Sequence, residues 1–217
     1  MKQFSLNDLA RMEKPQRVHF VNALSGFKSA NIIGTADRKQ NTNAAIVSSV
    51  FHLGSNPPLL GMILRPHSVA RHTLENIDET GVYTVNHVGE SFYQQAHQTS
   101  ARYDRTQSEF DACGLTAGYV DGFHAPYVVE SPLQVGMKLV EITPIQHNGT
   151  ELVIGEVEWV RVAESCVKDD GFLDLAANNT VAVSGLDSYY RTERLARLSY
   201  AKPDQPLTEL DLDGKKR

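Results

Sequence analysis

Residues 33–86 read IGTADRKQNTNAAIVSSVFHLGSNPPLLGMILRPHSVARHTLENIDETGVYTVN, and their segments decide the fold. Residues 30–36 and 44–53 predict strands, because β-branched and apolar residues dominate both runs and polar connections flank them. Residues 59–65 form a nearly continuous apolar run, which is typical of a buried strand. Pro57 and Pro58 cannot donate to a sheet, so we place both in the connection between strands.

One helix is predicted within this stretch, over Ser68–Glu79. Apolar residues recur there at helical spacing, Ser68 can cap the start, and Gly81 can end the helix. Residues 82–86 then predict one more strand.

The chain on either side adds more strands than helices. We expect a short helix over residues 5–12, a strand over 17–24, a polar helical stretch over 90–106 and a turn at 109–114. The clearest hairpin joins residues 135–146 to 151–163, where Asn148-Gly149 supplies the positive φ angles of a tight turn. Many antiparallel strands with few helices predict a mainly β fold, a β-barrel with peripheral helices.

The length of 217 residues suits one large domain or two small ones. Apolar segments follow one another without a linker or repeat, so we expect a single domain over residues 1–206 and a polar tail over 207–217. The two cysteines, Cys113 and Cys166, lie far apart and outside any metal-binding or dithiol motif. We therefore interpret them as buried, unreactive thiols and predict no metal site.

The charge balance argues against one class of partner. With 21 Lys and Arg against 26 Asp and Glu, the net charge is −5, and phosphate backbones repel such a chain. We expect no nucleic-acid partner, so any anion must be bound locally. No uncharged apolar run is long enough for a signal peptide core or a membrane span, which predicts a cytoplasmic protein without a membrane partner.

The most informative chemical feature is the cationic start of the predicted helix. It carries Arg65, His67, Arg71 and His72. Cations at a helix N-terminus oppose the macrodipole, whereas a bound phosphate would be held by the free amides, the arginines and the Thr73 hydroxyl. The alternative is a solvated basic helix start whose charges pair with Glu75 or Asp78.

Two adjacent hydroxyls, Ser48 and Ser49, interrupt an otherwise apolar strand. Buried hydroxyls need partners, so they either bond to backbone or face a polar ligand lying on the sheet. The sequence has no GxGxxG, P-loop, HExxH or GxSxG motif, and its histidines lack metal-ligand spacing. No catalytic residue is predicted from these patterns.

The order of several short motifs resembles a known family. The residues concerned are Thr35 and Asp37; Asn43, Ala45, Ser48 and Ser49; Asn56-Pro57-Pro58; Arg71, Thr73, Asn76 and Ile77; and Thr80-Gly81 with Val85-Asn86. Residues 108–162 and 185–206 are similar to later segments of the same family. Over residues 18–206 the chain resembles the flavin reductase-like family of FMN-binding split-barrel proteins.

The resemblance implies an FMN site along the strand at residues 43–50, with Ser48 and Ser49 at the ribityl chain and ring, and with the phosphate at Arg71 and Thr73. His72 departs from the family pattern, because many relatives have Asp at this position. The full cofactor-binding set that we expect is Asn43, Ala45, Ser48, Ser49, Val50, Arg65, His67, Arg71, His72 and Thr73.

The resemblance also implies a homodimer in which NAD(P)H reduces the flavin and electrons pass to an acceptor or to a monooxygenase partner. Two alternatives stay open: a flavoredoxin-like electron-transfer protein with permanently bound FMN, and a flavin-binding module without turnover. His124, Tyr127, Tyr189 and Tyr190 are candidates for covering the flavin or nicotinamide face, with ordinary core packing as the alternative reading.

Overall fold

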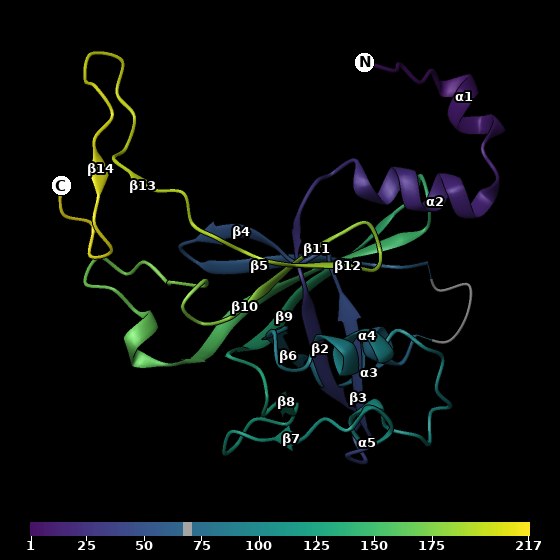
Figure 1. The fold of residues 1–217 in the computed structure, drawn as a ribbon. Coiled ribbons are helices and arrows are strands. Elements are labelled where there is room, and N and C mark those ends of the chain that lie inside the picture. The colour runs from purple at the N-terminus through teal and green to yellow at the C-terminus, as the bar shows by residue number, and fades with distance from the viewer. Residues whose placement is uncertain (67–70) are drawn as a thin grey trace.

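The computed structural model describes residues 1–66 and 71–217, and they form a mainly β protein (Figure 1). The helices are α1 (Leu6–Arg11), α2 (Lys14–Ala23), α3 (His72–Thr80), α4 (Tyr93–Gln98), α5 (Glu109–Cys113) and the 3-10 turn η1 (Glu164–Cys166). The strands are β1 (Lys28–Ser29), β2 (Asn31–Ala36), β3 (Thr42–Val47), β4 (Phe51–Ser55), β5 (Pro58–Leu64), β6 (Val82–His87), β7 (Ala117–Gly118), β8 (Tyr127–Val128), β9 (Leu133–Ile145), β10 (Thr150–Val162), β11 (Val181–Ser184), β12 (Ser188–Arg191), β13 (Arg197–Leu198) and β14 (Glu209–Leu210).

Within the described ranges, seven strands form one antiparallel sheet in the order β3-β2-β6-β9-β10-β5-β4. Its two edge strands, β3 and β4, follow one another in the chain. Where they join, the Ser49 hydroxyl donates to the Ile63 carbonyl at 2.7 Å and accepts from the Ile63 amide at 3.3 Å. The sheet therefore curls until the end of β3 meets β5, which confirms the expected barrel with peripheral helices.

Two apolar cores pack on opposite faces of β2. Ile33 joins the core inside the barrel, together with Met62, Tyr83 and Met137. Ile32 points to the other face, where α4, α5 and β11 supply most of the packing. Each such buried side chain stabilises the fold by about 1.5–3 kcal/mol. Burial on both faces explains why β2 reads as a continuous apolar run.

The β9–β10 hairpin is confirmed, with Ile145 paired to Thr150 across a four-residue loop. The turn differs from the expectation, because only Gly149 of the Asn148-Gly149 pair has a positive φ angle, which is 69°. Pro58 also differs: it is the first residue of β5, paired with Ser55, instead of lying between the strands. The first position of a strand tolerates proline because its missing donor interrupts no inner pair.

Four predictions near the site were wrong in part. The strand expected over residues 44–53 breaks at 48–50 into β3 and β4, because the chain crosses there from one sheet edge to the other. The polar helix expected over 90–106 shrinks to α4, and the turn expected at 109–114 contains helix α5. The helix expected over Ser68–Glu79 begins at His72 with Arg71 as its N-cap, and Gly81 ends it at φ 74° as predicted. Ser68 and His67 lie outside the described residues.

The strand expected over residues 17–24 was also wrong, because this segment belongs to helix α2. Pro15 stands in the first turn of α2, where a helix tolerates the missing amide. None of the ten residues of α2, all of which the structure describes, is buried. Figure 1 shows α1 and α2 set apart from the sheet on one side, with β13 and β14 projecting on another.

Helix α1 and both cysteines follow the sequence predictions. Ser5 caps α1 in a capping box with Asp8, and this places the helix over the expected residues. Cys113 and Cys166 are buried, and burial raises the pKa of the Cys113 thiol. Among the described residues no helix is long and apolar enough to cross a membrane.

Candidate functional site

A long groove of about 920 Å³ runs over the end of β3 and past the start of α3. Its walls come from β3, the end of β5, α3, the segment of residues 97–105 and the β11–β12 hairpin. The volume falls at the upper end of the roughly 300–1,000 Å³ typical of small-molecule sites. The groove is therefore the candidate site.

Three arginines gather at the α3 end of this groove: Arg65, Arg71 and Arg102. Burial lowers the pKa of Arg71, and the nearby charges of Arg65 and Arg102 lower it further. Within the described ranges no carboxylate lies at ion-pair distance from these three guanidinium groups. Such a cluster of like charges is stabilised by a bound anion.

Arg71 is held in place by the turn that leads into α3. Its Nε donates to the Pro66 carbonyl at 3.2 Å, and its backbone amide donates to Glu75 Oε1 at 3.1 Å. Glu75 also forms an ion pair with Arg105, which comes from a different segment. The bond to Pro66 therefore orients the Arg71 guanidinium at the groove.

The adjacent Thr73 hydroxyl is buried and accepts a hydrogen bond from Asn43 Nδ2 at 2.9 Å. This contact ties the first turn of α3 to β3, so that Asn43, His72 and Thr73 line the groove together. Asn43 and Thr73 are 30 residues apart in the sequence, and packing of α3 against the sheet brings them together.

The outer edge of β3 is covered by side chains in place of a further strand. Glu109 Oε2 accepts from the Ala44 amide at 3.0 Å, and Thr99 Oγ1 accepts from the Ile46 amide at 3.0 Å. Both acceptors are buried, and burial raises the pKa of Glu109. Ser48 comes directly after the end of β3 and lines the groove.

Eight of the ten expected cofactor-binding residues line this one groove: Asn43, Ala45, Ser48, Ser49, Arg65, Arg71, His72 and Thr73. The two serines differ, because the Ser49 hydroxyl is used to join β3 to β5. The Ser48 hydroxyl has no hydrogen-bond partner among the residues that the structure describes. Val50 packs against the barrel core instead of lining the groove, and His67 lies outside the described residues.

Known proteins resemble this chain in sequence and in fold. The flavin reductase like domain matches residues 24–178. The chain belongs to this flavin reductase-like family.

Solved structures agree with this assignment. A proposed flavin reductase with a split barrel domain from Shewanella frigidimarina is 58% identical, with a TM-score of 0.90 over 93% of this chain and 100% of that one. Flavoredoxin of Desulfovibrio vulgaris is 26% identical, with a TM-score of 0.70 over 94% and 98% of the two chains. Nitrilotriacetate monooxygenase component B from Bacillus cereus is 19% identical, with a TM-score of 0.79 over 91% and 98%, and shares the fold. The barrel is thus a split barrel of the flavin reductase kind.

The aromatic candidates of this flavin reductase-like chain separate clearly. The rings of His124 and Tyr127 are absent from the groove wall: His124 bonds to Gln40 and to the Asp37 carbonyl, and Tyr127 packs against Trp159. Tyr190 packs against Phe27. Tyr189 lines the groove, and its hydroxyl lies 3.0 Å from His97 Nδ1.

Several groove residues of this family member are not predicted by the sequence patterns. The segment that carries Arg102 and Arg105 reads as a polar helix, so nothing marked it as a wall of the site. Glu109 follows the N-cap of a five-residue helix and bonds to a strand 65 residues away. The sequence does give one signal: residues 100–106 carry two arginines and lack the apolar periodicity of a packed helix.

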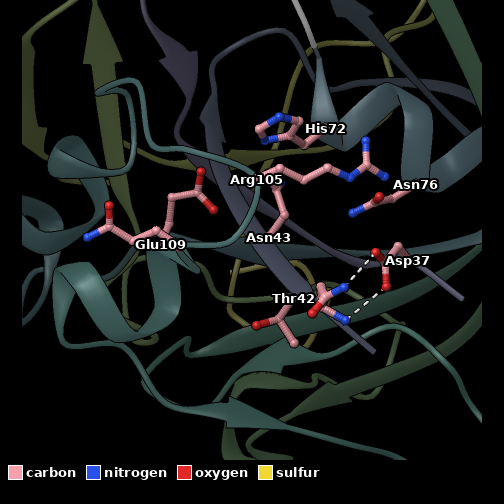
Figure 2. Close-up of a pocket in the computed structure, with 9 residues that line it drawn as sticks. Asp37, Thr42, Asn43, His72, Asn76, Arg105 and Glu109 are labelled. Carbon is pink, nitrogen blue, oxygen red and sulfur yellow. Dashed lines mark hydrogen bonds between the residues drawn. The ribbon is translucent and has the colours of Figure 1, made fainter. Parts of the chain in front are cut away.

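A small polar cavity of about 10 Å³ opens beside the arginines, and Figure 2 shows the side chains that converge on it. Its walls include Asp37, Asn43, His72, Arg105 and Glu109. The Asn41 side chain and amide, with a smaller effect of Arg105, lower the pKa of Asp37. The cavity has room for about one water molecule, so it belongs to the wall of the groove and is too small for a ligand.

Proposed function

We propose that this chain binds FMN in the groove and serves as an oxidoreductase that takes electrons from NAD(P)H. The observation that carries the proposal is the cluster of Arg65, Arg71 and Arg102, three guanidinium groups that face one groove without a carboxylate partner among the described residues. A phosphate monoester is the anion that such forked donors suit.

The remaining groove residues fit the other parts of the same molecule. Ile46, Val47, Ile63 and Leu64 give apolar surface for a flat ring, and Ser48 offers a hydroxyl that has no partner among the described residues. Thr73 and Asn43 are already oriented by their mutual hydrogen bond. We therefore assign the α3 end of the groove to the phosphate and the Ser48 end to the ring.

When bound, FMN supplies the hydride and electron chemistry. The chain's own residues have the tasks of binding, orientation and exclusion of water. The arginines hold the phosphate, the end of β3 supports the ring, and the buried Glu109 and Thr99 keep β3 in place without entering the chemistry. A nucleophile is not required.

The electron acceptor defines two versions of this proposal. The chain passes electrons to free acceptors or to a monooxygenase partner, as the relation in fold to a monooxygenase component B suggests. The second version is an electron carrier that keeps its FMN, which the 26% identity to a flavoredoxin favours. In the first version a nicotinamide nucleotide, NADH or NADPH, reduces the bound flavin. In the second version neither nucleotide does.

The proposal includes a homodimer. Helix α2 buries none of its residues, and several of them are apolar. Val18 and Val21 of this helix and the following Leu24 are 37%, 46% and 64% exposed. His19 and Asn22 of the same helix line the groove. A second copy packed on α2 would cover this apolar surface and would stand beside the site.

Binding of FMN tests the proposal directly. The purified chain is titrated with FMN, riboflavin and FAD while quenching of the flavin fluorescence is recorded. We expect tight, saturable binding of FMN and much weaker binding of riboflavin, because riboflavin lacks the phosphate. Equal affinities for FMN and riboflavin, or no binding, would contradict the assignment of the arginine cluster.

A further inference from the structure

We infer that Tyr189 and His97 form a second subsite in the groove, which binds the planar, carbonyl-bearing ring of the molecule that exchanges electrons with the flavin. The inference rests on the proposed FMN site and goes beyond it, because it assigns the wall opposite the arginines to a different ligand.

The position of this wall follows from the strand order. The small sheet β1-β11-β12 is connected to the barrel through β1, which directly precedes β2 in the chain. Asn31 at the start of β2 pairs with Val47 at the end of β3. The Ser29 hydroxyl of β1 also donates to the Val50 carbonyl at 3.4 Å. The β11–β12 hairpin therefore stands at the 47–50 end of the groove, away from Asn43 and Thr73.

The two ends of the groove differ in chemistry. One end is cationic, whereas the other is lined by Tyr189, His97, Val183 and Leu186, with Asp187 at the rim. A mononucleotide held by its phosphate at the arginines directs its ring toward the second end. A second substrate must meet that ring there, so the side chains of this wall are the ones it contacts.

Tyr189 is a defined hydrogen-bonding group and more than an apolar wall. Its hydroxyl lies 3.0 Å from His97 Nδ1, and the two rings meet edge to face at 5.7 Å. Burial, with a smaller contribution from Asp187, raises the pKa of Tyr189 to about 12, so the phenol stays protonated at neutral pH. When His97 Nδ1–H donates to the phenol oxygen, the Tyr189 hydroxyl keeps its own proton for a carbonyl oxygen on a planar ring.

Part of this wall lies outside the segment that matches the family. The match ends at residue 178, whereas Tyr189 belongs to β12 and His19 belongs to α2, which precedes residue 24. Tyr189 and His19 thus complete this end of the groove together with His97 of α4, which lies inside the match.

The experiment uses the FMN-loaded chain and measures binding, not turnover. The probes are 1,4,5,6-tetrahydro-NAD, which has a neutral ring and donates no hydride, and menadione, a planar quinone. We expect Tyr189→Phe to weaken one probe by about two- to tenfold, the loss for one neutral hydrogen bond. The probe that is weakened identifies the source of the ring, donor or acceptor. The FMN affinity stays within twofold of the parent.

Matched variants separate this role from folding. Tyr190→Phe removes a hydroxyl from the next residue of the same strand, which packs on Phe27 outside the groove, and leaves both probes unchanged. His97→Ala weakens the same probe as Tyr189→Phe, and His97→Gln restores part of the affinity because its amide can still bond to the phenol.

Each other outcome overturns the inference or its basis. If Tyr189→Phe weakens FMN as much as the probe, Tyr189 belongs to the flavin site and no second subsite exists. If FMN binds normally and neither probe responds to Tyr189→Phe, the wall only packs. If the parent chain does not bind FMN, the proposed function itself fails, which the fluorescence titration shows before any variant is made.

Discussion

At the scale of single residues, Arg71 carries most of the argument for an anion. Its guanidinium lies near two others, and burial and both neighbours lower its pKa, so the folded chain holds these charges together at a cost. Its hydrogen bond to the Pro66 carbonyl orients the group without neutralising it. A phosphate in the groove would offset that repulsion and use the free donors of the fork.

We predict that Arg71→Ala weakens FMN binding by about 1.5–3 kcal/mol, the range for hydrogen bonds to a charged group. Riboflavin, which lacks the phosphate, is expected to bind the variant and the parent equally. Fluorescence titration of both flavins against both proteins measures the difference.

A matched control for this prediction is Arg38→Ala. Arg38 is exposed, pairs with Glu79 on the surface and takes no part in the groove wall. This variant should bind FMN like the parent. If Arg71→Ala weakened riboflavin and FMN alike, the residue would be acting through the fold and not through the phosphate.

At the scale of elements, β3 is an edge strand that supports the site. An edge strand with open amides is prone to pairing with other chains, and Glu109 and Thr99 cover these amides from the α4–α5 segment. Ser48, which lines the groove, comes directly after this strand. Glu109 combines this structural task with an unfavourable buried charge.

We predict opposite effects for two substitutions of Glu109. Glu109→Ala leaves the Ala44 amide without its acceptor and costs about 1–3 kcal/mol of unfolding free energy. Glu109→Gln keeps an acceptor oxygen and removes the desolvated charge, so it is at least as stable as the parent at pH 7–8. Urea unfolding of the three proteins measures both differences.

The pH dependence gives this prediction a sign. Because burial raises the pKa of Glu109 above its ordinary value of 4.5, the folded chain binds this proton more tightly than the unfolded chain. The contribution of Glu109 to stability is thus full below pH 4.5 and is lost as pH rises through the raised pKa. The Glu109→Gln variant lacks this loss. A variant that grew less stable than the parent between pH 5 and pH 8 would contradict the assignment.

The sequence predicts the elements of the barrel better than it predicts the walls of the site. Period-two patterns and the Asn148-Gly149 turn locate β9 and β10, because local backbone preference and one buried face determine them. The break of β3 at 48–50 is not visible in the sequence, since Ser49 bonds to Ile63 only after the sheet has curled. Arg102 likewise reaches the groove through packing between distant parts of the chain, which local sequence patterns do not predict.

At the scale of the whole molecule, helix α2 leaves apolar surface exposed. We predict an obligate homodimer, because a ten-residue helix without buried residues is marginal on its own. Sedimentation equilibrium across a wide dilution range should show a species of twice 24.0 kDa, and thermal stability should rise with protein concentration.

Leu24→Ser tests the face of the dimer, since Leu24 is 64% exposed beside the apolar residues of α2. The variant should dissociate at higher protein concentration than the parent, while Leu195→Ser, at a fully exposed position of the C-terminal segment, should not. A folded 24.0 kDa monomer that holds FMN tightly would contradict the dimer and leave all cofactor contacts on one chain.

The central claim is that the groove makes this chain an FMN-dependent oxidoreductase, and an anaerobic titration tests it most directly. FMN-loaded protein is mixed with increasing NADH or NADPH without oxygen while the visible absorption of the flavin is recorded. We predict that one equivalent of at least one nicotinamide nucleotide bleaches the flavin, and that the colour returns with air. Flavin that stays oxidised with excess NADH and NADPH, yet is bleached by dithionite, would contradict the reductase and leave an electron carrier.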